Sequence, residues 1–182
     1  MANWNVAFSW LMQDEDATNL HATVPDSCPS GCAGPCWAIS GINSGAWPLQ
    51  FAKINALPQD QRGPEVETFY QAAFWNQWYA QLTSDEVAKR VFDMAVNGGE
   101  GTAVKLLQEA VNDAIGIPVS PIKLLIVDGQ LGQDTVQAAN FCDVDGIVSR
   151  FQQTRCAYYE AIVAKNPADA RYLDGWLARA RK

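Results

Sequence analysis

The sequence has few positive charges and no long apolar run. Its 182 residues contain 13 Lys and Arg against 20 Asp and Glu, giving a formal net charge of −7 and a pI near 4.6. Phosphate binding needs clustered cations, so this composition argues against a nucleic acid partner and against attraction to an anionic membrane. No stretch approaches the roughly 18 uninterrupted apolar residues that a transmembrane helix requires.

The N-terminal segment, MANWNVAFSWLMQDEDA, also lacks the features of a secretory signal. It has no basic region and no small-residue cleavage site. We therefore expect synthesis in the cytoplasm, with another route to any destination outside it.

Histidine is scarce, and cysteine is present in an odd number. His21 is the only histidine, whereas Cys28, Cys32 and Cys36 recur every four residues, and Cys142 and Cys156 lie far downstream. The absence of a C-x-x-C pair makes a metal site the weaker reading, so we favour at least one disulfide, with free thiols as the alternative. Two disulfides and one free thiol would suit an oxidising destination.

The composition is that of an ordinary globular chain, and its periodicity is mostly helical. With 48% hydrophobic and 18% charged residues, the sequence predicts a single domain over 1–182. A helix is expected first, followed by a long irregular or partly β segment rich in Gly, Pro, Ser and Cys. The expected helices occupy 3–16, 48–57, 64–82, 84–98, 102–114, 144–164 and 168–181, and a further helix opens at Asp134 or Thr135. The irregular segment is 17–48, and a linker is expected at 115–127.

One carboxylate lies on an apolar helical stripe. Trp4, Phe8, Leu11 and Glu15 fall at i, i+4, i+7 and i+11, so they share one helix face that should point inward. Burial raises a carboxyl pKa, which is how a protein keeps a general acid protonated near neutral pH. The alternative is that Glu15 only caps or pairs at the helix end.

Neighbouring acids are weaker candidates for the same cleft. Asp14 and Asp16 flank Glu15 but point about 100° away from it on a helix. Asp26 is the best nearby second carboxylate. A helix-terminal acid followed by an irregular polar segment is the arrangement used by lysozyme-like muramidases.

Several downstream segments resemble one enzyme family in the correct order. The stretch VFDMAVNGGEGTAVKLLQEAVND (91–113) is similar to the F-D-x-A-V-N-x-G segment of glycoside hydrolase family 108 muramidases. FYQAAFWNQW (69–78) resembles that family's Tyr/Trp-rich helix. DGQLGQDT (128–135) and the ending RFQQTRCAYYEAIVAKNPADARYLDGWLARAR (150–181) resemble its C-terminal peptidoglycan-binding region.

The resemblance implies a fold, a subdivision and a reaction. The fold is a mainly α, lysozyme-like domain, with helix one and the active-site segment in 1–57, a helical core in 64–114 and a peptidoglycan-binding-like region in 121–182. The reaction is hydrolysis of the β-1,4 bond between N-acetylmuramic acid and N-acetylglucosamine. It needs no cofactor and no metal.

The family's N-terminal signature can be matched to particular residues. Glu15 takes the catalytic acid position, Asp26 the second carboxylate, and Gly41-Ile42 the Gly-Ile pair. The glycines expected after the acid are Asp16 and Ala17 in this chain.

A hydroxyl expected near the signature is also missing. The Thr expected before Gly-Ile is Ala38, and Ser40 or Ser44 is a possible substitute. Asn97, like Asp93, belongs to the best-matched motif, where fixing the helix end is as plausible as contacting substrate. The candidate substrate-binding residues are Ser40, Asn43, Trp47, Tyr70 and Asn97.

Peptidoglycan is therefore the expected partner, in the periplasm or on the cell wall. A phage endolysin and a secreted antibacterial effector with an immunity protein both fit the chain. Two alternatives stay open: a non-catalytic peptidoglycan-binding or structural protein on the same scaffold, and a cysteine-ligated metal protein.

Overall fold

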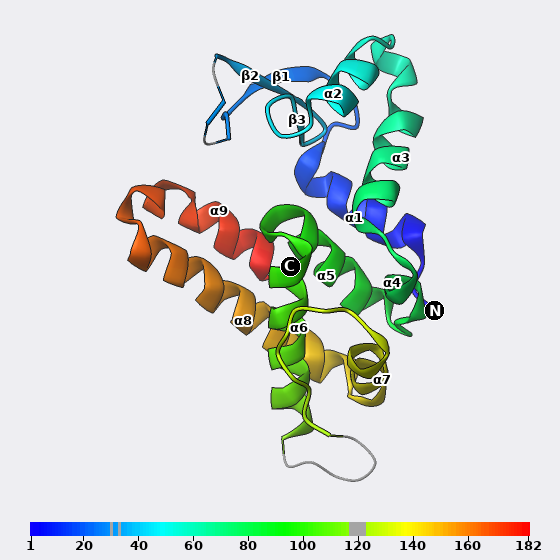
Figure 1. Cartoon of the computed structure of the whole chain (residues 1–182), viewed down its shortest axis with the longest axis vertical. Helices are drawn as coiled ribbons and strands as arrows, with labels where there is room; N and C mark the ends of the chain where they lie inside the picture. Colours follow the sequence, from blue (N-terminus) through cyan, green and yellow to red (C-terminus); the bar gives the residue numbers. More distant parts are fainter. Residues whose placement is uncertain (30, 33, 117–122) are drawn as a thin grey trace. The chain divides into compact units, whose positions relative to one another are not determined.

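The computed structural model describes the chain except for residues 30, 33 and 117–122, and it separates into two compact units. The N-terminal unit is Trp4–Asn76, and the C-terminal unit is Met1–Asn3 together with Gln77–Lys182. Figure 1 shows both units as mainly helical, with one small sheet in the N-terminal unit. The finer subdivision expected from the sequence stays a prediction.

In the sequence of the N-terminal unit, a three-stranded sheet follows the first helix and precedes two further helices. Its antiparallel strand order is β1-β2-β3. Helix α2 packs on β2 and β3, and α3 packs on both α1 and α2. In chain order the elements are α1 (Trp4–Glu15), β1 (Thr23–Asp26), β2 (Cys36–Ile39), β3 (Ile42–Asn43), α2 (Pro48–Asn55), the 3₁₀ turn η1 (Gln59–Gln61) and α3 (Gly63–Phe74).

The predicted apolar stripe forms part of an aromatic cluster in this unit. Leu11 is fully buried, and the Phe8 ring packs on both Trp4 and Tyr70. Proline occupies the first turn of α2, where its missing N–H is not needed.

The C-terminal unit is built around α5, α6 and α8. Helix α6 packs on both α5 and α8, and α9 lies alongside α8 (Figure 1). The elements are α4 (Gln77–Gln81), α5 (Asp85–Gly98), α6 (Glu100–Ile115), α7 (Gln133–Phe141), α8 (Val144–Lys165), the 3₁₀ turn η2 (Pro167–Asp169) and α9 (Ala170–Ala180).

Two local predictions in this region have different outcomes. The helix predicted over 84–98 is confirmed as α5, and Ser84 caps it by accepting a hydrogen bond from Val87 N. The single helix predicted over 64–82 is wrong, because Trp75 is extended and separates α3 from α4. The predicted linker at 115–127 lies partly outside the described residues.

A buried ion cluster joins three helices of the C-terminal unit. Asp93 of α5 accepts hydrogen bonds from Arg155 of α8 at 2.7 Å and from Arg179 Nε of α9 at 2.9 Å. Asp93 and Arg155 are almost completely buried, and their ion pair compensates the buried charge of each side chain. Asp93 of the family-like motif is therefore part of the helix packing.

The family-like DGQLGQDT turn is held by one glutamine. Gln108 of α6 donates to Asp128 Oδ1 at 2.8 Å and to Thr135 Oγ1 at 3.1 Å, and it accepts from Gly129 N.

Within the described residues, no helix is long and apolar enough to cross a membrane.

Candidate active site

Glu15 is the last residue of α1, and its carboxylate lies against the hairpin turn that joins β2 to β3. The side chain is half-buried. A Cβ added to Gly41 would overlap Glu15 Oε2 and would come within 2.7 Å of Tyr70 Oη. The bare α carbon of Gly41 is therefore what allows the acid to sit there.

The turn itself requires an unusual backbone. Ser40 and Gly41 both have positive φ, 47° and 77°, between the paired residues Ile39 and Ile42. Positive φ at both central positions is the type I′ pattern, which suits the twist of a two-residue hairpin but is strained for serine. The Tyr70 hydroxyl donates to Ser40 O at 2.7 Å.

Asp16 ties the segment after α1 to the same turn. Its Oδ2 accepts from Ser40 Oγ and from His21 N, each at 2.8 Å, and lies 3.0 Å from His21 Nδ1. Its Oδ1 accepts from Thr18 Oγ1 and Leu20 N.

These contacts also determine how Asp16 titrates. Burial alone would raise the pKa of the Asp16 carboxyl, but the hydrogen bonds from Ser40, His21 N and Thr18, with the charge of His21, together hold that pKa below its ordinary value. Asp16 is therefore an anionic anchor.

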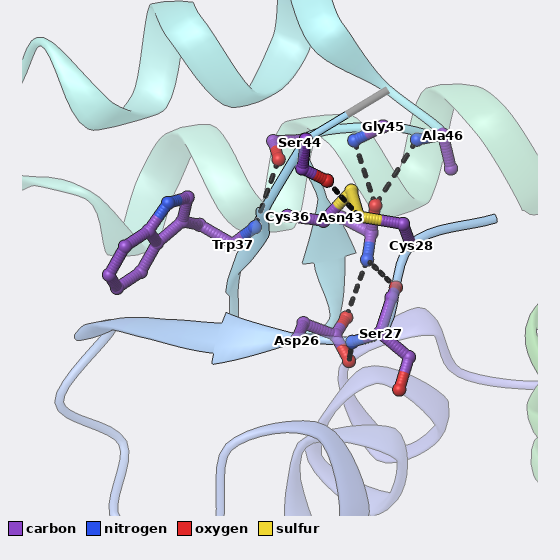
Figure 2. The surroundings of a disulfide bond; sticks show 10 residues. Asp26, Ser27, Cys28, Cys36, Trp37, Asn43, Ser44, Gly45 and Ala46 are labelled. Atoms are coloured by element: carbon purple, nitrogen blue, oxygen red, sulfur yellow. Dashed lines mark hydrogen bonds between the residues drawn. A yellow bond between two sulfur atoms is a disulfide. The ribbon is translucent and has the colours of Figure 1, made fainter. Parts of the chain in front are cut away.

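Asp26 is exposed at the end of β1, and an asparagine fixes its carboxylate (Figure 2). Asn43 Nδ2 donates to Asp26 Oδ2 at 2.7 Å and to Ser27 O at 2.9 Å, while Asn43 Oδ1 accepts from Gly45 N and Ala46 N. The second candidate carboxylate is thus held by a preorganised loop with a face left to solvent.

A disulfide closes the loop beside Asp26. Cys28 is bonded to Cys36, the residue that pairs with Asp26 across the sheet. The expectation of at least one disulfide is confirmed. A second disulfide is not formed, because Cys32, Cys142 and Cys156 are free thiols.

Trp47 lines a groove between α2 and α3. The groove has a volume of about 470 Å³, with Phe69, Ile54 and the Lys53–Glu65 ion pair among its walls. Trp47 is 36% exposed, and its indole packs edge-on against Phe69. An exposed indole next to polar side chains is suited to a sugar ring.

The remaining predicted binding residues are placed differently. Ser40 and Tyr70 are buried and bonded to Asp16 and to the turn, respectively. Asn97 belongs to the C-terminal unit, where its Nδ2 donates to Tyr159 Oη. Their contact with substrate stays a prediction.

The two serines considered as hydroxyl substitutes both bond to protein. Ser40 Oγ donates to Asp16, and Ser44 Oγ accepts from Trp37 N at 3.0 Å.

Within the part of the chain that the structure describes, no group of three or more His, Cys, Asp or Glu is arranged to hold a metal ion.

Sequence reasoning missed two residues. Helical spacing excludes Asp16 from the cleft of Glu15, whereas its contacts are with His21, 5 residues along the chain, and with Ser40, 24 residues along it. Trp37 is 42% exposed on β2 and points away from Asp26 in Figure 2. The Asp-x-Thr spacing of Asp16 and Thr18 was the one local signal, since such residues often hydrogen-bond neighbouring backbone.

Comparisons with known proteins agree with the motifs. Residues 39–99 match the family model for Glycosyl hydrolase 108, and residues 102–181 match the model for a Predicted Peptidoglycan domain. A solved structure, that of Brucella abortus SagA, has the same fold with a TM-score of 0.59 and 21% identity, over 98% of this chain and 96% of that chain. No curated protein matches the chain.

The fold and these matches define the class, a lysozyme-like glycoside hydrolase that is mainly α with a partly β segment after its first helix. Within that class, the chain matches glycosyl hydrolase 108 over 39–99 and a predicted peptidoglycan domain over 102–181, which confirms the resemblance found in the sequence. The combination supports a peptidoglycan hydrolase acting on the cell wall.

Proposed function

We propose that the chain is an N-acetylmuramidase that hydrolyses the β-1,4 bond between N-acetylmuramic acid and N-acetylglucosamine. The observation that carries the proposal is the position of Glu15. Glu15 is the last residue of α1, and its carboxylate lies against the turn of the small sheet. The chain also matches a glycosyl hydrolase family and a peptidoglycan domain.

The proposed chemistry divides the work between two carboxylates. Glu15 is the general acid that protonates the departing glycosidic oxygen. Asp26 is exposed and held by Asn43, so its carboxylate can orient water or stabilise the developing positive charge on the sugar.

Substrate binding is proposed for the loop and groove that follow Asp26. Asn43 and Trp47 lie on one continuous loop, in which Trp47 N donates to Asn43 O at 2.8 Å. A sugar ring stacked on the exposed Trp47 indole would extend the glycan from Asp26 towards the groove between α2 and α3.

The proposal is tested by the release of reducing ends from purified peptidoglycan. Glu15→Gln is expected to lower the rate by about 10²- to 10⁴-fold, the usual contribution of a general acid. Asp14→Asn, which removes a neighbouring exposed carboxylate, is the matched control and should retain the wild-type rate. Equal release by wild type and Glu15→Gln would overturn the assignment of the acid.

The bond that is cleaved can be identified from the same digest. After borohydride reduction, a muramidase leaves N-acetylmuramitol at the new ends, whereas an N-acetylglucosaminidase leaves N-acetylglucosaminitol. Mass spectrometry distinguishes the two, and glucosaminitol ends would contradict the muramidase specificity.

A non-catalytic peptidoglycan-binding protein is the second candidate, favoured by the replacement of the expected glycines with Asp16 and Ala17. It predicts that wild type sediments with sacculi and releases no reducing ends. The same two measurements therefore separate binding from hydrolysis.

Delivery as a phage endolysin or a secreted antibacterial effector is proposed on the basis of the target. Expression of the chain in a bacterial cytoplasm should be harmless, whereas fusion to a periplasmic export signal should lyse the cells through Glu15. Protection by a gene that neighbours the chain's own gene would identify an immunity protein and favour the effector. Lysis without any protective neighbour would favour the endolysin.

A further inference from the structure

We infer that Asp16 is a positioning residue that acts with Tyr70 to hold the Ser40–Gly41 turn against the Glu15 carboxylate. Asp16 itself touches no substrate. The inference rests on the proposed role of Glu15 as general acid, and it assigns a task to a residue that stands where a glycine was expected.

The first step is that both oxygens of Asp16 are committed to the protein. Oδ2 accepts from Ser40 Oγ and His21 N, and Oδ1 accepts from Thr18 Oγ1 and Leu20 N. The side chain is only 8% exposed. A carboxylate bonded in this way is rigid and anionic, and it is occupied in fixing two segments of chain.

The second step is that the turn is held at two separate points. Asp16 binds the hydroxyl of Ser40, and Tyr70 binds the carbonyl of Ser40 at 2.7 Å. Serine at φ 47° is strained by about 1–3 kcal/mol, and such strain persists only where surrounding contacts over-determine the backbone. Asp16 supplies its contact from the residue after α1, and Tyr70 supplies its contact from α3.

The third step is that the turn leaves the acid little freedom on that side. The α carbon of Gly41 is so close to the Glu15 carboxylate that no Cβ would fit between them. A shift of the turn would open that space and let the carboxyl group rotate away. Misplacing a catalytic group by about 1 Å can cost about 10²-fold in rate.

Asp16 therefore affects the chemical step without touching the sugar. Its loss should lower kcat, because the acid is displaced, and should leave KM nearly unchanged, because the glycan contacts remain. A general loss of folding has a different signature, since it lowers the folded fraction and the thermal transition together.

The test compares three variants on soluble peptidoglycan fragments. Asp16→Asn and Tyr70→Phe are each expected to lower kcat by about 10- to 100-fold, with KM changed by less than about twofold. Asp14→Asn makes the same charge change on the other side of Glu15 and should stay within about twofold of wild type. Tyr70→Phe keeps the ring in its packing and changes no charge, so it carries the test if Asp16→Asn fails to fold.

A double variant separates a shared turn from two independent effects. Because Asp16 and Tyr70 hold the same residue, Ser40, Asp16→Asn/Tyr70→Phe should lose no more than about threefold beyond the worse single variant. Losses that multiply would overturn the inference, as would unchanged kcat in both single variants. An equal loss in Asp14→Asn would show an effect of charge alone and would also overturn it.

Failure of the proposed function gives a different pattern. A wild-type chain without hydrolysis, or a Glu15→Gln variant as active as wild type, would overturn the role of Glu15 and the inference with it. An active wild type with an inactive Glu15→Gln variant and a fully active Asp16→Asn variant would overturn the positioning role alone.

Discussion

At the scale of single residues, both the conformation of the turn and the proposed position of the catalytic acid depend on Gly41. Gly41→Ala is expected to lower kcat by about 100-fold, since the added Cβ would overlap the Glu15 carboxylate. Because alanine is strained at the φ of 77°, the substitution should also lower the unfolding free energy by about 1–3 kcal/mol. Gly116→Ala is the matched control, because Gly116 also has a positive φ of 62° and open space around it. It should lose stability and keep activity, measured by denaturation and reducing-end release; full activity in Gly41→Ala would contradict this account.

Asp16 should make the stability of the chain depend on pH. Its folded-state pKa is lowered, so its contribution is present above the ordinary aspartate pKa of about 3.9 and is lost as the pH falls through the lower, folded value. At neutral pH, Asp16→Asn should lower the unfolding free energy by about 1.5–3 kcal/mol, the range for hydrogen bonds to a charged group. Denaturation curves from pH 7 to pH 2 check this. A gap between wild type and variant that widens on acidification would contradict the sign.

At the scale of elements, the disulfide is the covalent support of the loop that carries Asp26. Replacing Cys28 and Cys36 together with serine should lower the unfolding free energy by about 2–3 kcal/mol, because the bridge closes a short loop in the unfolded chain. Cys32→Ser, at an exposed free thiol in the same loop, should change it by less than about 0.5 kcal/mol. Thermal melts with and without reductant provide the measurement. A wild type insensitive to reductant would contradict the role of the bridge.

The sequence predicted helices better than it predicted the sheet or the site. Long amphipathic segments such as α5 and α6 carry enough periodicity to be recognised, and Ser84 marked a helix start. Strands of two to four residues carry no useful period, and the Trp75–Asn76 break has neither Gly nor Pro to announce it. The contacts of Asp16 depend on a turn 24 residues away. Helical spacing separates Asp16 from Glu15, but Asp16 follows the end of α1, and both carboxylates lie against the Ser40–Gly41 turn.

At the scale of the whole molecule, the family resemblance carried more than any local pattern. The apolar stripe drew attention to Glu15, but a carboxylate on such a stripe is compatible with simple pairing at a helix end. The ordered segments over 69–78, 91–113, 128–135 and 150–181 gave the substrate class, and the matches over 39–99 and 102–181 agree with them. In this chain, Asp16 and Tyr70 are proposed to hold the turn against the acid where the family's glycines are absent.

The net charge of −7 predicts how salt affects binding to the cell wall. Peptidoglycan stem peptides carry free carboxylates, so long-range electrostatics oppose the approach of this acidic chain and binding must come from short-range contacts. Raising the salt from about 10 mM to about 150 mM shortens the Debye length from about 30 Å to about 8 Å and should leave binding unchanged or strengthen it. Glu15→Gln is the suitable form of the protein, because it does not digest the sacculi during co-sedimentation. A bound fraction that falls steeply with added salt would show that a local basic patch drives binding despite the overall charge.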